Sequence, residues 1–159
     1  MFTEGNERTH EKFVNLSIGH KGRHFFMKPD ERQELIKHRM NLSRETIKEA
    51  ERLLQNPPHL RGAINRIYYA VFYSIQALAI SHEIIISKHT HAISFFDREF
   101  VKEKIFDKAL SKIIHNTFDL RLGSDYQDFL DVNGEEVKEY LSQAKALINA
   151  IERYLKKMN

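Results

Sequence analysis

The chain has 159 residues, a formal net charge of +3 and no cysteine. This length fits one domain with a core of ordinary size, and the lack of thiols excludes disulfides, thiolate zinc sites and cysteine nucleophiles. No apolar run approaches the roughly 18 residues that a membrane span needs, and the first residues lack the apolar stretch of a signal peptide. We therefore expect a cytoplasmic protein without a membrane segment.

Residues 1–28 differ from the remainder of the chain. They carry five Lys or Arg against three acidic residues, so the remainder is close to neutral. A near-neutral body offers no general footprint for nucleic acid, and any RNA contact has to be local. Because no apolar periodicity persists in residues 1–28, we predict a disordered or loosely packed arm there, with Met27 as an alternative natural start. A helical domain is expected over residues 29–159.

The first half of this domain predicts three helices. Asp30 is expected to cap the first one, which ends before Asn56-Pro57-Pro58. The second helix, over residues 59–81, is the most apolar segment and is expected at the centre of the molecule. Residues 83–86 are the only β-like run and are short enough to be a loop. Ser87 is then expected to cap a short third helix with apolar residues at 92, 93, 95, 96 and 100.

Two further helices complete the prediction. Asp107 is expected to cap the fourth, and Asn133 the fifth, with Glu136 three positions after Asn133 as in a capping box. The apolar residues of both segments recur every three or four positions. The sequence therefore predicts an all-α fold, an up-and-down bundle of four long helices and one short helix.

Polar and aromatic residues share one face of the predicted second helix. Arg66, Tyr69 and Tyr73 follow one another at three or four residues, with Gly62 and Gln76 in the same row. One interpretation is a solvated edge with a few amphipathic aromatics. However, an exposed face usually carries Glu and Lys, and residues 59–81 contain neither. This favours a covered face.

A second polar set ends the predicted fourth helix, just before Gly123, a natural helix stop. Arg121 there either complements the helix dipole, pairs with Asp119 or Asp125, or belongs to a site. Asp125 and Tyr126 add a carboxylate and a phenol directly after it. An arginine, a carboxylate and a phenol form a compact set of donors and acceptors, so we expect one site that joins both segments.

Histidines open the predicted third helix. His89 and His91 are two residues apart and point in nearly opposite directions on a helix, which makes them a poor metal pair. His89 is either a member of the polar cleft or a surface residue near the cap. The sequence offers no metal set, no glycine-rich phosphate loop and no cofactor motif.

Three segments together resemble HEPN-domain proteins, a small α-helical superfamily that is paired in prokaryotes with minimal nucleotidyltransferases. They are Arg66-Ile67-Tyr68-Tyr69-Ala70-Val71-Phe72, Lys88-His89, and the run from Arg121 to Tyr126. Within this superfamily, the chain resembles the stand-alone family that has an Arg-x-x-Tyr-Tyr-Ala-x-Phe helix. It covers roughly residues 28–157.

The resemblance implies a helical bundle that forms homodimers, with polar residues of both subunits lining a cleft. Many HEPN proteins are metal-independent ribonucleases, toxins or RNA-processing factors that carry an arginine followed by a histidine after four to six residues. This chain has Asp125, Tyr126 and Gln127 at those positions. An unshifted tyrosine is ionised only about one part in a thousand at pH 7, so Tyr126 is a poor substitute for a histidine base.

Three hypotheses of function follow. The first is a toxin-like or nucleotide-binding half of a HEPN and nucleotidyltransferase pair, with metal-independent RNA cleavage at Arg121, Asp125, Tyr126 and His89. In it, Arg66, Tyr69 and Tyr73 bind the nucleotide or RNA. The second is a non-catalytic module that presents a nucleotide or polynucleotide to a partner nucleotidyltransferase. The third is an interaction protein whose polar cleft only sets the geometry of a homodimer.

Overall fold

The computed structural model describes residues 23–24, 27–126 and 132–159. Within this part of the chain, β1 (Arg23–His24) is followed by α2 (Pro29–Leu53), α3 (Leu60–Ser81), β2 (Ile84–Ile85), α4 (His89–Phe96), α5 (Lys108–Tyr126) and α6 (Gly134–Lys157). A π-helical segment, Asp97–Val101, continues α4. The prediction of an all-α bundle with four long helices and one short one is confirmed.

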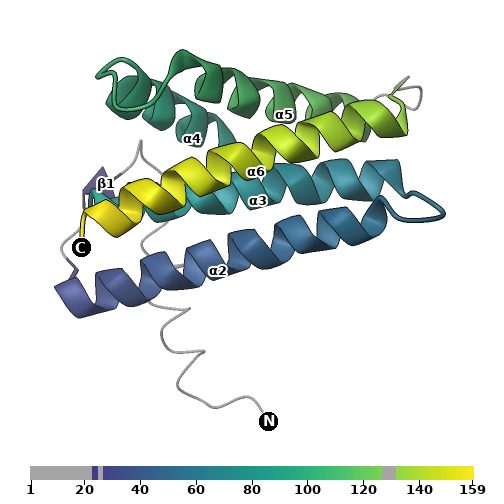
Figure 1. Ribbon diagram of the computed structural model, residues 1–159. Helices are drawn as coiled ribbons and strands as arrows, with labels where there is room; N and C mark the ends of the chain where they lie inside the picture. The colour runs from purple at the N-terminus through teal and green to yellow at the C-terminus, as the bar shows by residue number, and fades with distance from the viewer. Residues whose placement is uncertain (1–22, 25–26, 127–131) are drawn as a thin grey trace, which may run out of the picture.

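Helix α3 lies at the centre of the bundle. In Figure 1, α6 passes in front of it, α2 lies below it, and α4 and α5 lie above it. More than half of the residues of α3 are buried, which is the expected fate of the most apolar helix. Ser43 on α2 donates a buried hydrogen bond of 2.6 Å to the Ala70 carbonyl, so the α2–α3 contact also satisfies a polar group.

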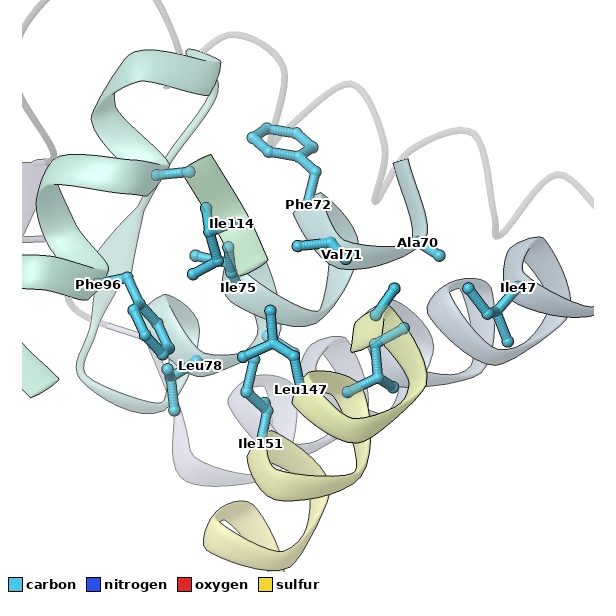
Figure 2. Close-up of a cluster of buried hydrophobic side chains, with 14 of the residues drawn as sticks. Ile47, Ala70, Val71, Phe72, Ile75, Leu78, Phe96, Ile114, Leu147 and Ile151 are labelled. Atoms are coloured by element: carbon cyan, nitrogen blue, oxygen red, sulfur yellow. The ribbon is translucent and has the colours of Figure 1, made fainter. Parts of the chain in front are cut away.

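One apolar core joins all five α-helices. Figure 2 shows side chains from each of them converging, with members Ile47, Val71, Ile75, Leu78, Phe96, Ile114, Leu147 and Ile151. Phe96 and Phe100 are fully buried and stack with ring centroids 5.9 Å apart. Phe100 stands on the π-helical segment, so this segment contributes a buried ring to the core.

The caps explain where most of the helices begin. His59 precedes α3, and its Nδ1 accepts a 3.0 Å hydrogen bond from the backbone N–H of Gly62. A Cβ at Gly62 would lie 2.5 Å from that nitrogen, so this glycine serves the cap and takes no part in the polar cleft. Asn133 caps α6 by accepting from Glu136 N–H, as predicted, and Asp107 accepts from Ala109 N–H at the start of α5.

Several predicted boundaries were wrong. Helix α2 begins at Pro29, which needs no N–H partner at a first position, so Asp30 lies inside the first turn. Lys88 rather than Ser87 precedes α4. Gly123 does not end α5, which continues to Tyr126. Glycine is common just after a helix, but a helix can also continue through it, as α5 does here.

A short two-stranded ladder lies outside the bundle. Arg23 pairs with Ile85 and His24 with Ile84 in antiparallel register. Within the β-like run at residues 83–86, which was expected to be a loop, Ile84 and Ile85 therefore form a short strand. Met27 is only 4% exposed. The division into an arm over 1–28 and a domain over 29–159 remains a prediction, because residues 1–22 and 25–26 lie outside the described part. None of the helices within that part has the length and hydropathy to cross a membrane.

Candidate functional site

Arg121 of α5 lies over two tyrosine rings of α3. Its guanidinium carbon is 4.9 Å from the ring centroid of Tyr68 and 5.2 Å from that of Tyr69. One of its terminal nitrogens also donates a long hydrogen bond of 3.4 Å to the Tyr69 hydroxyl. A guanidinium over a ring face is attracted by about 0.5–2 kcal/mol. Two such contacts hold the Arg121 head group in one orientation.

His89 enters the same site from the first turn of α4. Its Nδ1 hydrogen-bonds to the Tyr68 hydroxyl, and its ring stacks on Phe72 with centroids 4.5 Å apart. Phe72 and Tyr68 are both buried, so the imidazole is fixed on two sides. His89 and Arg121 are therefore brought together through Tyr68, although Arg121 follows His89 by 32 positions in the sequence.

The electrostatics of the site favour a neutral imidazole. Burial lowers the pKa of His89 below its ordinary value of 6.5, and the positive charge of Arg121 lowers it further. His89 is thus predominantly uncharged at pH 7. Burial also raises the pKa of Tyr68, and the opposing effect of Arg121 is smaller. The phenol therefore keeps its proton.

Two tautomers of His89 satisfy the contact with Tyr68. If Nδ1 carries the proton, it donates to the phenol oxygen, and Nε2 offers a lone pair as a proton acceptor. If Tyr68 donates to Nδ1, then Nε2 carries the proton and can donate to an anion. The site can therefore accept a proton or donate a hydrogen bond at the same atom.

Arg66 completes the other end of the site. Its guanidinium carbon is 5.4 Å from the ring centroid of Tyr69, so two guanidinium groups lie near this ring. Arg66 also lies 3.6 Å from a carboxylate oxygen of Glu49 on α2 and donates to the side chain of Asn65. Tyr73 follows along α3, with its ring centroid 6.0 Å from that of Tyr69.

The sequence-predicted residues have different outcomes. Arg121, His89 and Tyr69 form one cluster, with Arg66 and Tyr73 at its two ends. Asp125 and Tyr126 belong to the last turn of α5, and their side chains lie outside the part of the chain that the structure describes. The roles given to all of these residues remain predictions.

Sequence reasoning missed Tyr68 as a site residue. Its side chain is 4% exposed and lies on the apolar side of the row formed by Arg66, Tyr69 and Tyr73, so helical periodicity assigns it to the core. The available signal is chemical, because a buried phenol needs a polar partner. Two consecutive tyrosines in an otherwise apolar helix therefore indicate that at least one of them meets a polar side chain.

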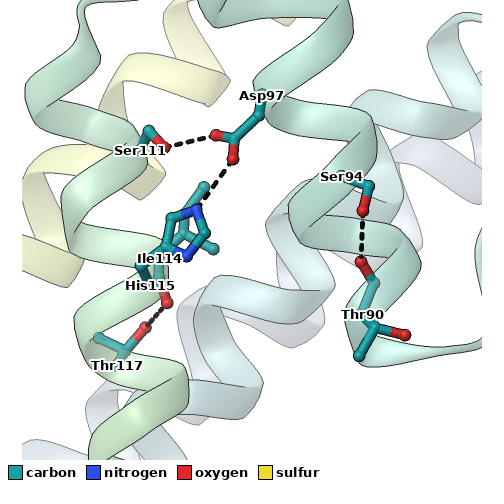
Figure 3. Close-up of polar contacts among 7 residues, drawn as sticks. All are labelled: Thr90, Ser94, Asp97, Ser111, Ile114, His115 and Thr117. Carbon is teal, nitrogen blue, oxygen red and sulfur yellow. Dashed lines mark hydrogen bonds and ion pairs between the residues drawn. The ribbon is translucent and has the colours of Figure 1, made fainter.

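A second polar cluster joins the π-helical segment to α5. Figure 3 shows the Asp97 carboxylate between Ser111 and His115: one oxygen accepts from the Ser111 hydroxyl and the other lies 2.8 Å from His115 Nε2. A serine nucleophile needs the histidine next to its own oxygen, whereas here both residues contact the aspartate. This arrangement fastens α5 to the π-helical segment and lacks a base for Ser111.

Acidic and histidine side chains do not gather into a metal centre within residues 27–123 and 132–159. No group of three or more side chains of that kind is close enough to hold an ion there. Near the rings of Tyr68 and Tyr69, the positive charge comes from Arg121 and Arg66.

The sequence model of the HEPN domain matches residues 36–154. A protein of Thermotoga maritima named UPF0332 protein is 34% identical over 126 residues, which cover 79% of this chain and 95% of the relative. Two proteins of Methanocaldococcus jannaschii are named Putative toxin. One is 31% identical over 67% of this chain and 73% of its own length. The other is 28% identical over 79% of this chain and 92% of its own length.

Proposed function

We propose that this chain, which belongs to the HEPN domain family, is the toxin-like member of a two-protein system and acts on RNA. The observation that carries the proposal is the position of Arg121, held by two tyrosine rings beside a neutral histidine. In RNA cleavage without a metal, a guanidinium can stabilise the charge on the phosphate oxygens and an imidazole can accept the 2′-hydroxyl proton. The similarity to proteins named Putative toxin supports the toxin-like part.

In the proposed reaction, Arg121 binds the non-bridging oxygens of the scissile phosphate. His89, as the tautomer with its proton on Nδ1, accepts the 2′-hydroxyl proton at Nε2. The 2′ oxygen then attacks phosphorus, the bond from phosphorus to the 5′ oxygen breaks, and the leaving 5′ oxygen takes up a proton from water. The products are a 2′,3′-cyclic phosphate and a 5′-hydroxyl. Arg121 stabilises the charge that develops on phosphate oxygens, so the step requires no metal ion.

The experiment is incubation of the purified protein with total RNA in EDTA. We expect cleavage to persist and every new 3′ end to be a 2′,3′-cyclic phosphate, measured by end-specific labelling. Protein with Arg121→Ala, purified in the same way, is the control because it would carry any contaminating nuclease. Cleavage that requires a divalent ion, or that is equal in the control, would overturn the proposed function.

A second candidate function is binding without cleavage. It is favoured by the sequence after Arg121, where Asp125, Tyr126 and Gln127 occupy the positions of the histidine in nucleolytic relatives. In that case the protein binds RNA or a nucleotide through Arg121 and presents it to a partner. The same incubation separates the candidates, because RNA would stay intact while binding still depended on Arg121.

Two partners belong to the proposal. One is a small nucleotidyltransferase, which the pairing of HEPN proteins with such enzymes supports. The other is a second copy of the chain. The lack of Glu and Lys between His59 and Ser81 supports cover over this face of α3. In the proposed homodimer, the two faces meet across a cleft that still admits a strand.

A further inference from the structure

Arg39 of α2 is a half-buried arginine without a carboxylate partner among the described residues. Its Nε is fully buried and has no hydrogen-bond partner there. Other half-buried or partly exposed arginines of the bundle have such partners: Arg32 lies 2.7 Å from Glu83, Arg44 pairs with Glu152, and Arg66 lies 3.6 Å from Glu49. Arg39 therefore differs from these three arginines, because no carboxylate among the described residues pairs with it.

The position of Arg39 extends the tyrosine row of α3. Ser43, one turn after Arg39 on α2, donates to the carbonyl of Ala70, one turn before Tyr73 on α3, so Arg39 lies level with Tyr73 where the two helices pack. Burial lowers the pKa of Arg39, and the opposing effect of Tyr73 is smaller. Tyr73 lies one helical turn, about 6 Å along the axis, beyond Tyr69. Gln76 follows after Tyr73, and its Oε1 is buried without a hydrogen-bond partner in the described residues. The described residues thus leave a donor, Arg39 Nε, and an acceptor, Gln76 Oε1, without a hydrogen-bond partner.

The energetics favour a ligand at this point. A half-buried cation without a partner is costly, and an anion that reaches it offsets part of that cost. A tyrosine ring at the same place offers a stacking surface for a base, and successive rings with cationic neighbours are how proteins bind single strands. The distance between the rings of Tyr69 and Tyr73 suits an RNA strand whose successive bases stack along α3.

We propose that Arg39 and Tyr73 form a second nucleotide subsite, in which Arg39 binds the next phosphate and Tyr73 stacks on the next base of a single-stranded RNA. The inference rests on the proposed function, because it takes the Arg121 and His89 cluster as the first subsite. It adds the residues that hold the nucleotide next to the scissile phosphate.

The test measures binding of a 2′-O-methyl hexanucleotide, which cannot be cleaved, and of adenosine monophosphate to the full chain. Arg39→Met keeps the apolar stem and removes the charge. We expect it to weaken hexanucleotide binding about tenfold and to leave mononucleotide binding unchanged. The slope of log affinity against log salt should fall by about 0.7 for the lost phosphate contact. Arg39→Lys should restore part of both the affinity and the slope.

The remaining outcomes overturn the inference. An equal loss for both ligands, or no loss, would show that Arg39 is not a second subsite, while binding that depends on Arg121 would still support the proposed function. A hexanucleotide that fails to bind the unaltered protein would defeat both. If Arg39→Met instead turns a dimer into a monomer in sedimentation, Arg39 pairs with a second copy, and the RNA assignment is wrong.

Discussion

Replacing Arg121 by alanine is expected to lower the rate of RNA cleavage by about 10³-fold, because the variant loses the positive charge that stabilises the phosphate oxygens in the transition state. Binding of the uncleavable strand should weaken as well. Arg121→Lys should recover only part of the rate. An ammonium keeps the charge but cannot form two parallel hydrogen bonds to phosphate, and it replaces the planar group that lies over Tyr68 and Tyr69.

The control for charge is Arg153→Ala, which removes an exposed arginine of α6. This variant should retain the full rate. Thermal melting of each variant separates a loss of function from a loss of fold, since a guanidinium on two ring faces also contributes to stability. If a folded Arg121→Ala protein cleaves RNA as fast as the unaltered chain, Arg121 has no role in the chemistry.

Replacing His89 by glutamine is expected to lower the cleavage rate by about 10²–10⁴-fold, the usual contribution of a general base. Glutamine can still hydrogen-bond to Tyr68 but does not titrate. His91→Gln, two positions further on the same helix, is the matched control and should keep the rate. An unchanged rate in His89→Gln would remove His89 from the reaction.

The pH dependence of cleavage provides an independent readout for His89. The base form is the neutral imidazole, so the rate should rise with pH through the pKa of His89 and then level off. Burial and Arg121 both disfavour the charged form, so this pKa is lower than 6.5 and the midpoint of the limb falls below pH 6.5. His89→Gln should lose this acidic limb. A limb that stays in place would belong to another group.

The sequence was sufficient for the fold because its helices obey one rule throughout. Apolar residues recur every three or four positions, and polar residues that favour caps or turns separate the segments. Asn133 shows how far this goes, since its cap and the following helix were both predicted. The errors occurred at helix ends, where Pro29 and Gly123 each allow more than one outcome and packing decides between them.

The site was only partly predictable from the sequence. The row of Arg66, Tyr69 and Tyr73 follows from helical spacing within one segment. The approach of His89 to Arg121 does not, because it depends on how α4 and α5 pack on α3. Tyr68 is the residue that joins them, and its periodicity places it in the core. A buried phenol that needs a partner was the signal, but the sequence alone does not identify the partner.

Arg39 lay beyond sequence reasoning for a different reason. On a helical wheel it is an ordinary cation of a surface helix, and such residues are usually solvated or paired. Its buried Nε and the absence of a carboxylate within the described residues appear only when α2 is packed on α3. Charges without a partner are properties of the assembled fold, so pattern analysis of one helix does not detect them.

The most direct test of the central claim, that Arg121 and His89 form one phosphate-binding site, is nuclear magnetic resonance of the histidine side chains. Their imidazole nitrogens report protonation, tautomer and ligand contact, and His89→Gln assigns the signal among the nine histidines. We predict that His89 titrates below pH 6.5, that its signal shifts when the 2′-O-methyl hexanucleotide is added, and that in Arg121→Ala its pKa rises and the shift disappears. A His89 signal that titrates at or above 6.5, or that does not move at saturating strand, would contradict the account.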